Sequence, residues 1–308
     1  CLIKRCPMVL AERIEFSPHL VSFYTEIVRL SSQVCRARYA LTLSEYELLA
    51  ALRESSGPLL IGELSDLLVL QVGTIWQMTS SLAKRGLIEG RSSKEDGRYQ
   101  LCSLTEDGEL LASRCCEDLH GYLNSICMRL LPDSEFFEYM NRSIASSLDV
   151  LRGHEAACSF KMAREVRFKV EFTIMIRVLM EKWRSCIASV CGLSLTQFRM
   201  LHVLDEAQAV RVQDLADSLF IPRSQASTCK NVLISGGYAW QQNNPDDARS
   251  VIVFRTSKGS ALVNQILPPL NEITVDSHNP GSDEGVAVLR AWLARMYCNL
   301  SSHWRANV

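Results

Sequence analysis

The chain has 308 residues, of which 47% are apolar, and a formal charge of -1 at pH 7. This length indicates two domains of ordinary size, and the near-neutral charge argues against indiscriminate binding of polyanions while leaving a local basic face open. Glycine and proline are scarce, at 15 and 9 residues, so neither long disorder nor a small disulfide-stapled fold is indicated.

No segment is expected to enter a membrane. The longest apolar run, from Phe172 to Met180, is interrupted by Arg177 and is far shorter than the roughly 20 residues that span a bilayer. No signal peptide is visible in the sequence. We therefore expect a soluble, cytoplasmic protein.

The 12 cysteines show no Cys-x-x-Cys spacing, so neither a zinc site nor a disulfide framework is expected. Most of them should be small buried hydrophobic residues. No nucleophile–base pair, phosphate-binding glycine loop or metal cluster stands out. We therefore expect no cofactor, no metal, no catalytic residue and no enzymatic activity.

A stretch of about 45 residues occurs twice without a gap, and such a match indicates two structural copies. The copies are offset by 151 residues, and the matched pairs are Leu64 with Leu215, Leu70 with Ile221, Leu82 with Leu233, Gly86 with Gly237, Thr105 with Thr256 and Gly108 with Gly259. We accordingly divide the chain into a first repeat, 1–153, and a second repeat, 154–308.

Each repeat is expected to begin with a long helix. Apolar residues three and four positions apart mark one helical face from Leu20 to Ala37, and another from Phe168 to Trp183. A capping box then opens a second helix, at Thr42-Leu43-Ser44-Glu45 in the first repeat and at Ser194-Leu195-Thr196-Gln197 in the second.

A helix-turn-helix and a hairpin follow in each repeat. The helix-turn-helix segments are 61–68 with 71–84, and 212–219 with 222–234. After a glycine stop at Gly86 or Gly237, two short strands flank a polar tip, which is the pattern of a hairpin. The predicted strands are 87–89 with 99–104, and 238–240 with 250–255, and the tips are 92–97 and 243–248.

Each repeat should end in two further helices. The first begins after Thr105 or Thr256, and breaks are expected at Pro132-Asp133 and over 276–283. The final helices carry apolar stripes that need packing partners. The stripes are Ile144, Leu148 and Leu151 in the first repeat, and Leu289, Leu293, Met296 and Leu300 in the second.

Four short motifs occur in the same order in both repeats. They are Leu41-Thr42, Arg85-Gly86-Leu87-Ile88, Asp96-Gly97-Arg98 and Leu104-Thr105-Glu106-Asp107-Gly108, then Leu193-Ser194, Gly236-Gly237-Tyr238, Asp247-Ala248-Arg249 and Thr256-Ser257-Lys258-Gly259. This order, covering nearly the whole chain, resembles the MarR family of winged-helix transcription regulators.

The resemblance implies a mainly α fold with small β-hairpin wings. Two tandem winged helix-turn-helix repeats would have long terminal helices forming a pseudo-twofold dimerisation region, as in a homodimer fused into one chain. We therefore expect a monomeric pseudo-dimer, with further homodimerisation left open. Because fused halves need not be identical, the DNA target need not be palindromic.

The second repeat offers a polar and cationic face to DNA. Its candidate base-contacting residues are Arg223, Ser224, Gln225, Ser227 and Lys230, whereas Ala226, Cys229 and Leu233 take the core side. Arginine can bind guanine through two hydrogen bonds, and glutamine can bind adenine in the same way. An ordinary solvated helix face is the alternative.

The first repeat lacks these cations, since Val72, Gly73, Trp76 and Thr79 stand at the positions of Arg223, Ser224, Ser227 and Lys230. Gln71, Thr74 and Gln77 remain candidates for base contacts, and Val72 could meet a thymine methyl group. For Trp76, core or interdomain packing, a DNA contact and a protein contact all stay open.

The Asp-x-Arg motifs are interpreted as wing residues. Arg98 and Arg249 could enter the narrow, strongly negative minor groove, with Asp96 and Asp247 orienting each guanidinium through a charge-assisted hydrogen bond. A weak surface ion pair is the alternative. Phosphate contacts are expected from Lys84, Arg85 and Arg91.

The implied function is a DNA-binding transcription regulator, a repressor, which binds double-stranded DNA and is released by a small aromatic effector. In the family such effectors bind between the long helices and the winged domain. Residues near that region by chain position are Arg38, Tyr39, Trp183, Arg199 and His202, and for each of them we expect a core or helix-surface role instead.

Two other functions stay open. One is a thiol-based redox switch, with Cys6, Cys35, Cys186 and Cys191 in or near the leading helices; a sensor thiol must be exposed and have a low pKa. The other is a degenerate winged-helix module that contacts proteins and does not bind DNA.

Overall fold

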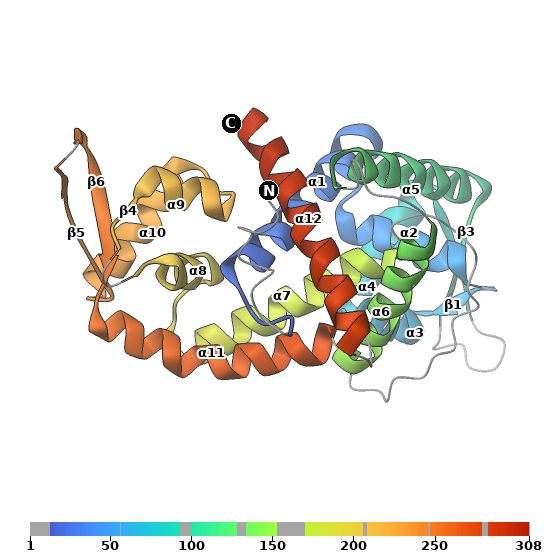
Figure 1. The fold of residues 1–308 in the computed structure, drawn as a ribbon. Coiled ribbons are helices and arrows are strands. Elements are labelled where there is room, and N and C mark those ends of the chain that lie inside the picture. The colour runs from blue at the N-terminus through green and yellow to red at the C-terminus, as the bar shows by residue number, and fades with distance from the viewer. Residues whose placement is uncertain are drawn as a thin grey trace. The chain divides into compact units, whose positions relative to one another are not determined.

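A computed structural model describes residues 13–55, 57–92, 100–127, 134–152, 170–205, 208–245, 247–278 and 283–307 (Figure 1). The chain forms two compact units. The first-repeat unit is Ile27–Val178, and the second-repeat unit combines Cys1–Glu26 with Leu179–Val308. The units therefore differ from a division of the chain into two successive halves.

Each leading helix contributes to both units. The start of α1 (Pro18–Tyr39), up to Glu26, belongs to the second-repeat unit, and the start of α7 (Val170–Cys191), up to Val178, belongs to the first-repeat unit. The two repeats thus exchange the first halves of their leading helices. Sequence periodicity predicts each helix but not this exchange, because an apolar stripe does not specify which surface covers it.

The remaining elements come in the same order in both units. The first-repeat unit has α2 (Leu43–Glu54), β1 (Leu59–Leu60), α3 (Ile61–Leu68), α4 (Val72–Lys84), β2 (Ile88–Ser92), β3 (Gln100–Leu104), α5 (Glu106–Cys127) and α6 (Ser134–Arg152). The second-repeat unit has α8 (Leu195–Val203), β4 (Val210–Arg211), α9 (Val212–Leu219), α10 (Arg223–Ser235), β5 (Ala239–Asn244), β6 (Asp247–Arg255), α11 (Ser257–His278) and α12 (Asp283–Asn307).

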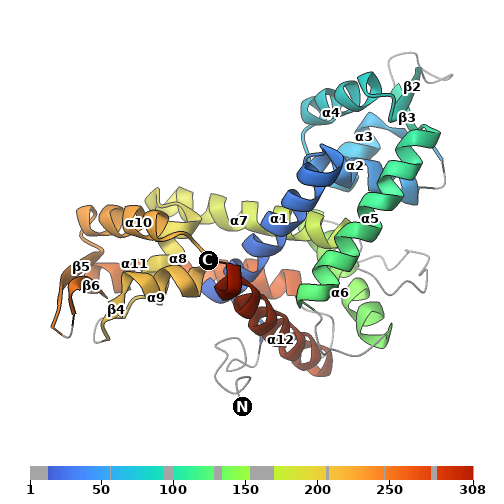
Figure 2. The same cartoon turned by 90° about the horizontal axis from the view of Figure 1, so that it is seen from above.

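Each unit holds one small antiparallel sheet beside its helix-turn-helix. The strand orders are β1-β3-β2 and β4-β6-β5, and Figure 2 shows α3 and α4 next to the β2–β3 hairpin. The prediction of a mainly helical fold with hairpin wings is confirmed. The third strands, β1 and β4, were not predicted, because two residues are too short for a pattern of alternation.

Both predicted capping boxes are present. The Thr42 hydroxyl accepts a hydrogen bond from the Glu45 amide at 3.1 Å, and the Glu45 carboxylate accepts one from the Thr42 amide at 2.8 Å. Ser194 and Gln197 make the equivalent pair of bonds at 3.3 and 2.8 Å. These bonds fix the first turns of α2 and α8.

The Thr-x-x-Gly motif fastens each wing to the helix that follows it. The Thr105 hydroxyl donates to the Gly86 carbonyl at 2.7 Å and accepts from the Gly108 amide at 3.0 Å. A Cβ atom on Gly108 would lie only 1.9 Å from the Leu87 carbonyl oxygen. Thr256 and Gly259 repeat the arrangement. The motif therefore depends on glycine for the close approach of helix and strand.

The apolar stripes largely form the cores. From Leu20 to Val34 the predicted residues of α1 are buried, and so are all the predicted residues of the final helices. Ala37 is exposed, so its assignment to the stripe is wrong: it lies in the last turn of α1, beyond the residues that pack. Phe168 lies outside the described residues.

Among the described helices, none is long and apolar enough on its own to cross a membrane. Taken together, α7 and α8 reach the required length and composition, but they meet at a bend of 79°.

Three histidines of the second-repeat unit are held in their neutral form. Burial lowers the pKa of His19, His202 and His278 to about 4, with smaller contributions from Arg199 at His19 and from Arg255 at His202. The His278 Nδ1 donates to the Thr274 carbonyl, and its Nε2 therefore accepts from the Tyr24 hydroxyl at 2.5 Å. A proton on Nε2 would remove this acceptor.

Acidification should therefore destabilise this unit. The pKa values of these histidines in the folded chain lie below the ordinary value of 6.5. Their contribution to the free energy of unfolding is therefore fully present above pH 6.5 and is lost as the pH falls toward 4. Each histidine contributes up to about 1.4 kcal/mol per pH unit to this loss of unfolding free energy. Urea unfolding at pH 7.5, 6 and 5 measures this loss, and His278→Gln should reduce the slope. An unchanged free energy of unfolding over this range would contradict the prediction.

Candidate nucleic-acid interface

Helix α10 presents the polar face that the sequence predicts. Arg223, Ser224, Gln225 and Ser227 are exposed, and Lys230 is half-exposed. The opposite face is buried through Ala226, Cys229 and Leu233. Within the described part of the chain, no hydrogen bond or ion pair engages the Arg223 guanidinium, so this cation is available in the first turn of the helix. Figure 1 shows α10 beside the β5–β6 wing.

Helix α4 has the same position in the first-repeat unit but a different surface. Gln71, Thr74 and Gln77 are exposed, as the prediction requires. Val72 and Trp76 are 48% and 45% exposed, so Trp76 does not belong to the core. Thr79 is buried and donates its hydroxyl proton to the Trp76 carbonyl at 3.1 Å. The face of α4 is therefore apolar where that of α10 is cationic.

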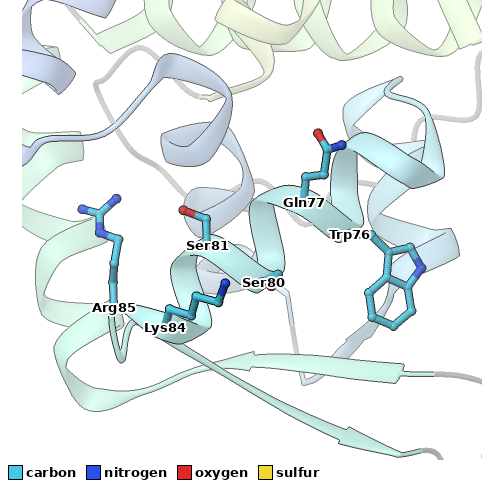
Figure 3. A pocket seen from close by; sticks show the side chains of 6 residues that line it. All are labelled: Trp76, Gln77, Ser80, Ser81, Lys84 and Arg85. Atoms are coloured by element: carbon cyan, nitrogen blue, oxygen red, sulfur yellow. The ribbon is translucent and has the colours of Figure 1, made fainter.

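A surface hollow of about 600 Å³ runs along α4 (Figure 3). Two rows of side chains, each spaced by four residues, line it: Trp76, Ser80 and Lys84 in one row and Gln77, Ser81 and Arg85 in the other. Arg85 is engaged, since it lies 3.8 Å from the Glu45 carboxylate and donates to the Tyr39 carbonyl at 3.3 Å. Lys84 is exposed and can reach a phosphate.

The second wing is longer than its sequence pattern predicts. β6 begins at Asp247, which pairs with Asn244 next to an irregularity in the register. Asp247 and Arg249 thus lie in the first residues of β6, whereas the sequence pattern starts this strand at residue 250. Cross-strand pairing extends the hairpin over polar residues that carry no strand signal. The backbone of Arg249 is described but its side chain is not, and Asp96 and Arg98 lie outside the described residues.

An aromatic pair lies at the base of this wing. Trp240 is 43% exposed and stacks on Phe254, with ring centroids 4.4 Å apart. The pair joins β5 to β6 directly across the ladder. The sequence predicts a strand at Trp240 but no role for its side chain, and cross-strand aromatic pairs of this kind stabilise a hairpin and its register.

An arginine holds the turn of each helix-turn-helix, Arg177 half-buried in one unit and Arg199 fully buried in the other. In the first-repeat unit, Arg177 of α7 donates to the Leu68 carbonyl and to Glu47, which is fully buried in α2. In the second-repeat unit, Arg199 of α8 donates to the Leu219 carbonyl and to the Ser22 hydroxyl of α1, both at 2.6 Å. Carbonyls at a helix end have no partner within the helix, so both arginines stabilise the end of the helix before the recognition helix.

The same turn contains an unusual backbone conformation in both units. Val69 has φ 49° and Phe220 has φ 52°, a left-handed conformation that costs free energy in residues with bulky side chains. Each lies directly after the carbonyl that an arginine binds. We infer that Arg177 and Arg199 help to hold the angle between the two helices of each motif.

The residues near the effector region have structural roles, as the sequence analysis expects. Arg38 and Tyr39 both bind Asp118, at 2.7 and 2.8 Å. Trp183 is fully buried, and its indole donates to the Thr274 hydroxyl at 3.1 Å. The His202 ring stacks on Phe16, with centroids 6.1 Å apart.

Among the described cysteines, Cys35, Cys115 and Cys186 do not have the surroundings of a thiolate sensor. Six of the nine described are buried, which confirms that most are small core residues. The Cys35 and Cys115 sulfurs lie 3.9 Å apart in the core, and the hydrogen bond between them, followed by burial, raises the pKa of Cys115. Burial also raises the pKa of Cys186. Cys6 lies outside the described residues.

Among the described residues, no group of three or more histidine, cysteine or acidic side chains could hold a metal ion.

Comparisons with known proteins agree with this geometry at the level of the domain. Residues 41–108 match a family described as a winged helix DNA-binding domain, which confirms the winged helix of the first repeat. Among curated proteins, none matches the chain.

Several solved structures are similar over part of the chain. The transcriptional regulator SlyA has 18% identity and a TM-score of 0.40, with 43% of this chain and 92% of that one covered. Apo MarR from E. coli has 22% identity and a TM-score of 0.33, with 40% of this chain and 90% of that one covered. A probable transcriptional regulator from Pseudomonas aeruginosa has 25% identity and a TM-score of 0.28, with 31% of this chain and 74% of that one covered. These neighbours include MarR and SlyA regulators, the type that the sequence motifs resemble.

Proposed function

We propose that the chain is a MarR-type transcription regulator, a repressor, that binds double-stranded DNA through two unequal winged-helix modules fused in one chain. One observation carries the proposal: α10 exposes Arg223, Ser224 and Gln225 in its first turn, at the end of a helix-turn-helix that enters the major groove in DNA-binding proteins. The family match to a winged helix DNA-binding domain supports the same interpretation for the first repeat.

The two modules are proposed to bind unequal half-sites. α10 places a cation in its first turn, whereas α4 places Val72 at that position and has no cation before Lys84. Since symmetric sites follow from symmetric dimers, a fused and unequal pair favours an asymmetric site. The repeats 1–153 and 154–308, acting as a monomeric pseudo-dimer in the cytoplasm, belong to this proposal.

We further propose that a small aromatic effector releases the DNA. This part rests on the resemblance of the sequence motifs to the family. Among the similar structures, NadR was solved in complex with 4-hydroxyphenylacetate, and DNA binding by BpsR from Bordetella bronchiseptica is regulated by 6-hydroxynicotinic acid.

Salt dependence tests the DNA-binding function. Each phosphate that the protein neutralises should contribute about -0.9 to the slope of log affinity against log salt concentration. Several phosphate contacts from the basic residues of both modules should therefore make the DNA affinity fall steeply as the salt concentration rises. The measurement is a titration of the full chain with labelled duplex DNA at 50 to 200 mM salt. Absence of salt-dependent DNA binding would favour the degenerate protein-contacting module.

The wing arginines should contribute unequally. Arg249→Ala is expected to weaken DNA binding about tenfold, the loss of roughly one charge-assisted contact, because its wing lies beside the cationic recognition helix. Arg98→Ala should have a smaller effect. Gel-shift affinities of the two variants decide this, with the unfolding curve of each as a control. The opposite order would refute the asymmetry.

A further inference from the structure

Helix α4 exposes large apolar side chains at the positions where a recognition helix contacts bases. Val72 and Trp76, four residues apart, stand where α10 has Arg223 and Ser227. They are among the most exposed large hydrophobic residues described, at 48% and 45%. Contiguous exposed apolar patches mark binding surfaces more often than isolated apolar residues do.

The chemistry of this face selects one kind of base pair. Guanine recognition in the major groove relies on arginine or lysine, and α4 has neither before Lys84. Thymine alone offers a methyl group there, which apolar side chains contact, and adenine is the base that glutamine binds through two hydrogen bonds. Gln71 and Gln77 flank the two apolar residues and are exposed. Apolar contacts and amides together therefore suit A·T pairs.

The hollow on α4 gives room for a contact with Trp76. Between Trp76 and Lys84 in the same row stands only the small side chain of Ser80 (Figure 3). A methyl group can lie against the indole there, while the Lys84 ammonium two turns along the helix meets a phosphate. The Thr79 hydroxyl, on the buried side of the helix, is satisfied by its bond to the Trp76 carbonyl.

We propose that α4 reads A·T base pairs through thymine methyl groups, with Val72 and Trp76 as the specificity-determining residues. α10 reads guanine through Arg223, so the two half-sites differ in base composition. This inference rests on the proposed function, since it requires that the chain binds DNA.

Deoxyuridine tests the proposal, because it lacks only the methyl group of thymidine. The duplex is the preferred site recovered by selection from random DNA, and the half-site whose base preference changes in Arg223→Ala is assigned to α10. Replacing the thymidines of the other half-site should weaken binding of the unaltered chain about fourfold for each contacted methyl group. The same replacement in the α10 half-site should change affinity by less than twofold.

Variants locate the contact on the protein. Val72→Ala and Trp76→Ala should bind the thymidine duplex more weakly than the unaltered chain and should lose most of the response to deoxyuridine. Val190→Ala is the matched control, a similarly exposed valine on α7 at 42%, and it should keep the full response. Alanine favours helix formation, so the variants are expected to fold, and circular dichroism verifies this.

The outcomes separate the two proposals. Sequence-selective binding that is indifferent to deoxyuridine in the α4 half-site overturns the methyl contact and leaves the proposed function standing. If Val72→Ala and Trp76→Ala leave the DNA affinity unchanged, the methyl contact is also overturned and this face is reassigned to a protein contact. Absence of any sequence-selective DNA binding overturns both.

Discussion

Replacing Arg223 with alanine is expected to lower the affinity for the preferred DNA site by about 10- to 100-fold and to relax the preference for guanine in one half-site. A bidentate arginine–guanine contact provides roughly 1 to 3 kcal/mol of discrimination. Arg223 is exposed in the first turn of α10, and the buried Ala226, Cys229 and Leu233 fix which face of the helix is turned outward. Titrations of the selected duplex and of a guanine-substituted duplex at one salt concentration measure both effects.

Arg223→Lys is the matched control. Lysine keeps the charge but not the planar fork of donors, so the salt slope should stay unchanged while the guanine preference falls. If Arg223→Ala instead weakens binding equally for all sequences and reduces the salt slope by about one, the residue contacts a phosphate and does not specify a base.

Replacing Arg177 with methionine should destabilise the first-repeat unit by about 3 to 5 kcal/mol, the usual cost of leaving a buried charge without its partner. Glu47 is fully buried, and its carboxylate lies 3.1 Å from the Arg177 guanidinium. The variant also leaves the Leu68 carbonyl without its donor. Urea unfolding at pH 7.5 measures the loss, and because the same carbonyl precedes the turn to α4, DNA affinity should fall as well.

The pH dependence identifies the cause. Burial raises the pKa of Glu47, and the Arg177 charge opposes this increase; without Arg177 the pKa rises further. A carboxyl whose pKa is raised in the folded state destabilises the fold only while it is ionised. The loss of unfolding free energy in Arg177→Met, relative to the unaltered chain, should therefore shrink as the pH falls and Glu47 is protonated.

Two further variants control for packing. Arg184→Met on the same helix breaks an exposed pair with Glu181 and should cost less than about 1 kcal/mol. The double replacement Arg177→Met with Glu47→Leu should recover much of the stability. A loss below about 1 kcal/mol for Arg177→Met alone would show that the Arg177–Glu47 pair does not support the fold.

The sequence predicts the local elements well because their signals are local. The capping boxes at Thr42 and Ser194 and the start of α4 and α10 within one or two residues follow from side chains that act on adjacent backbone. The outward face of α10 follows from the period of its apolar residues. For the same reason the repeated motifs suffice to identify the winged helix.

Features that depend on distant partners could not be predicted in this way. The exchange of the α1 and α7 segments depends on which surfaces cover an apolar stripe, and the start of β6 at Asp247 depends on cross-strand pairing. One signal was present in the sequence: Arg177 interrupts an apolar run, and Glu47 aligns with Arg199 in the other repeat. A charged residue at a position where the helix pattern expects burial indicates a polar contact, but the sequence does not show which residue is the partner.

Footprinting of the full chain on a DNA site selected from random sequence tests the central proposal most directly, with the number of chains per duplex determined on the same complex. We predict that one chain protects two major-groove segments about one helical turn apart, unequal in sequence, and that Arg223→Ala removes protection from only one of them. Two chains bound symmetrically to a palindrome, or no sequence-selective protection at all, would contradict it.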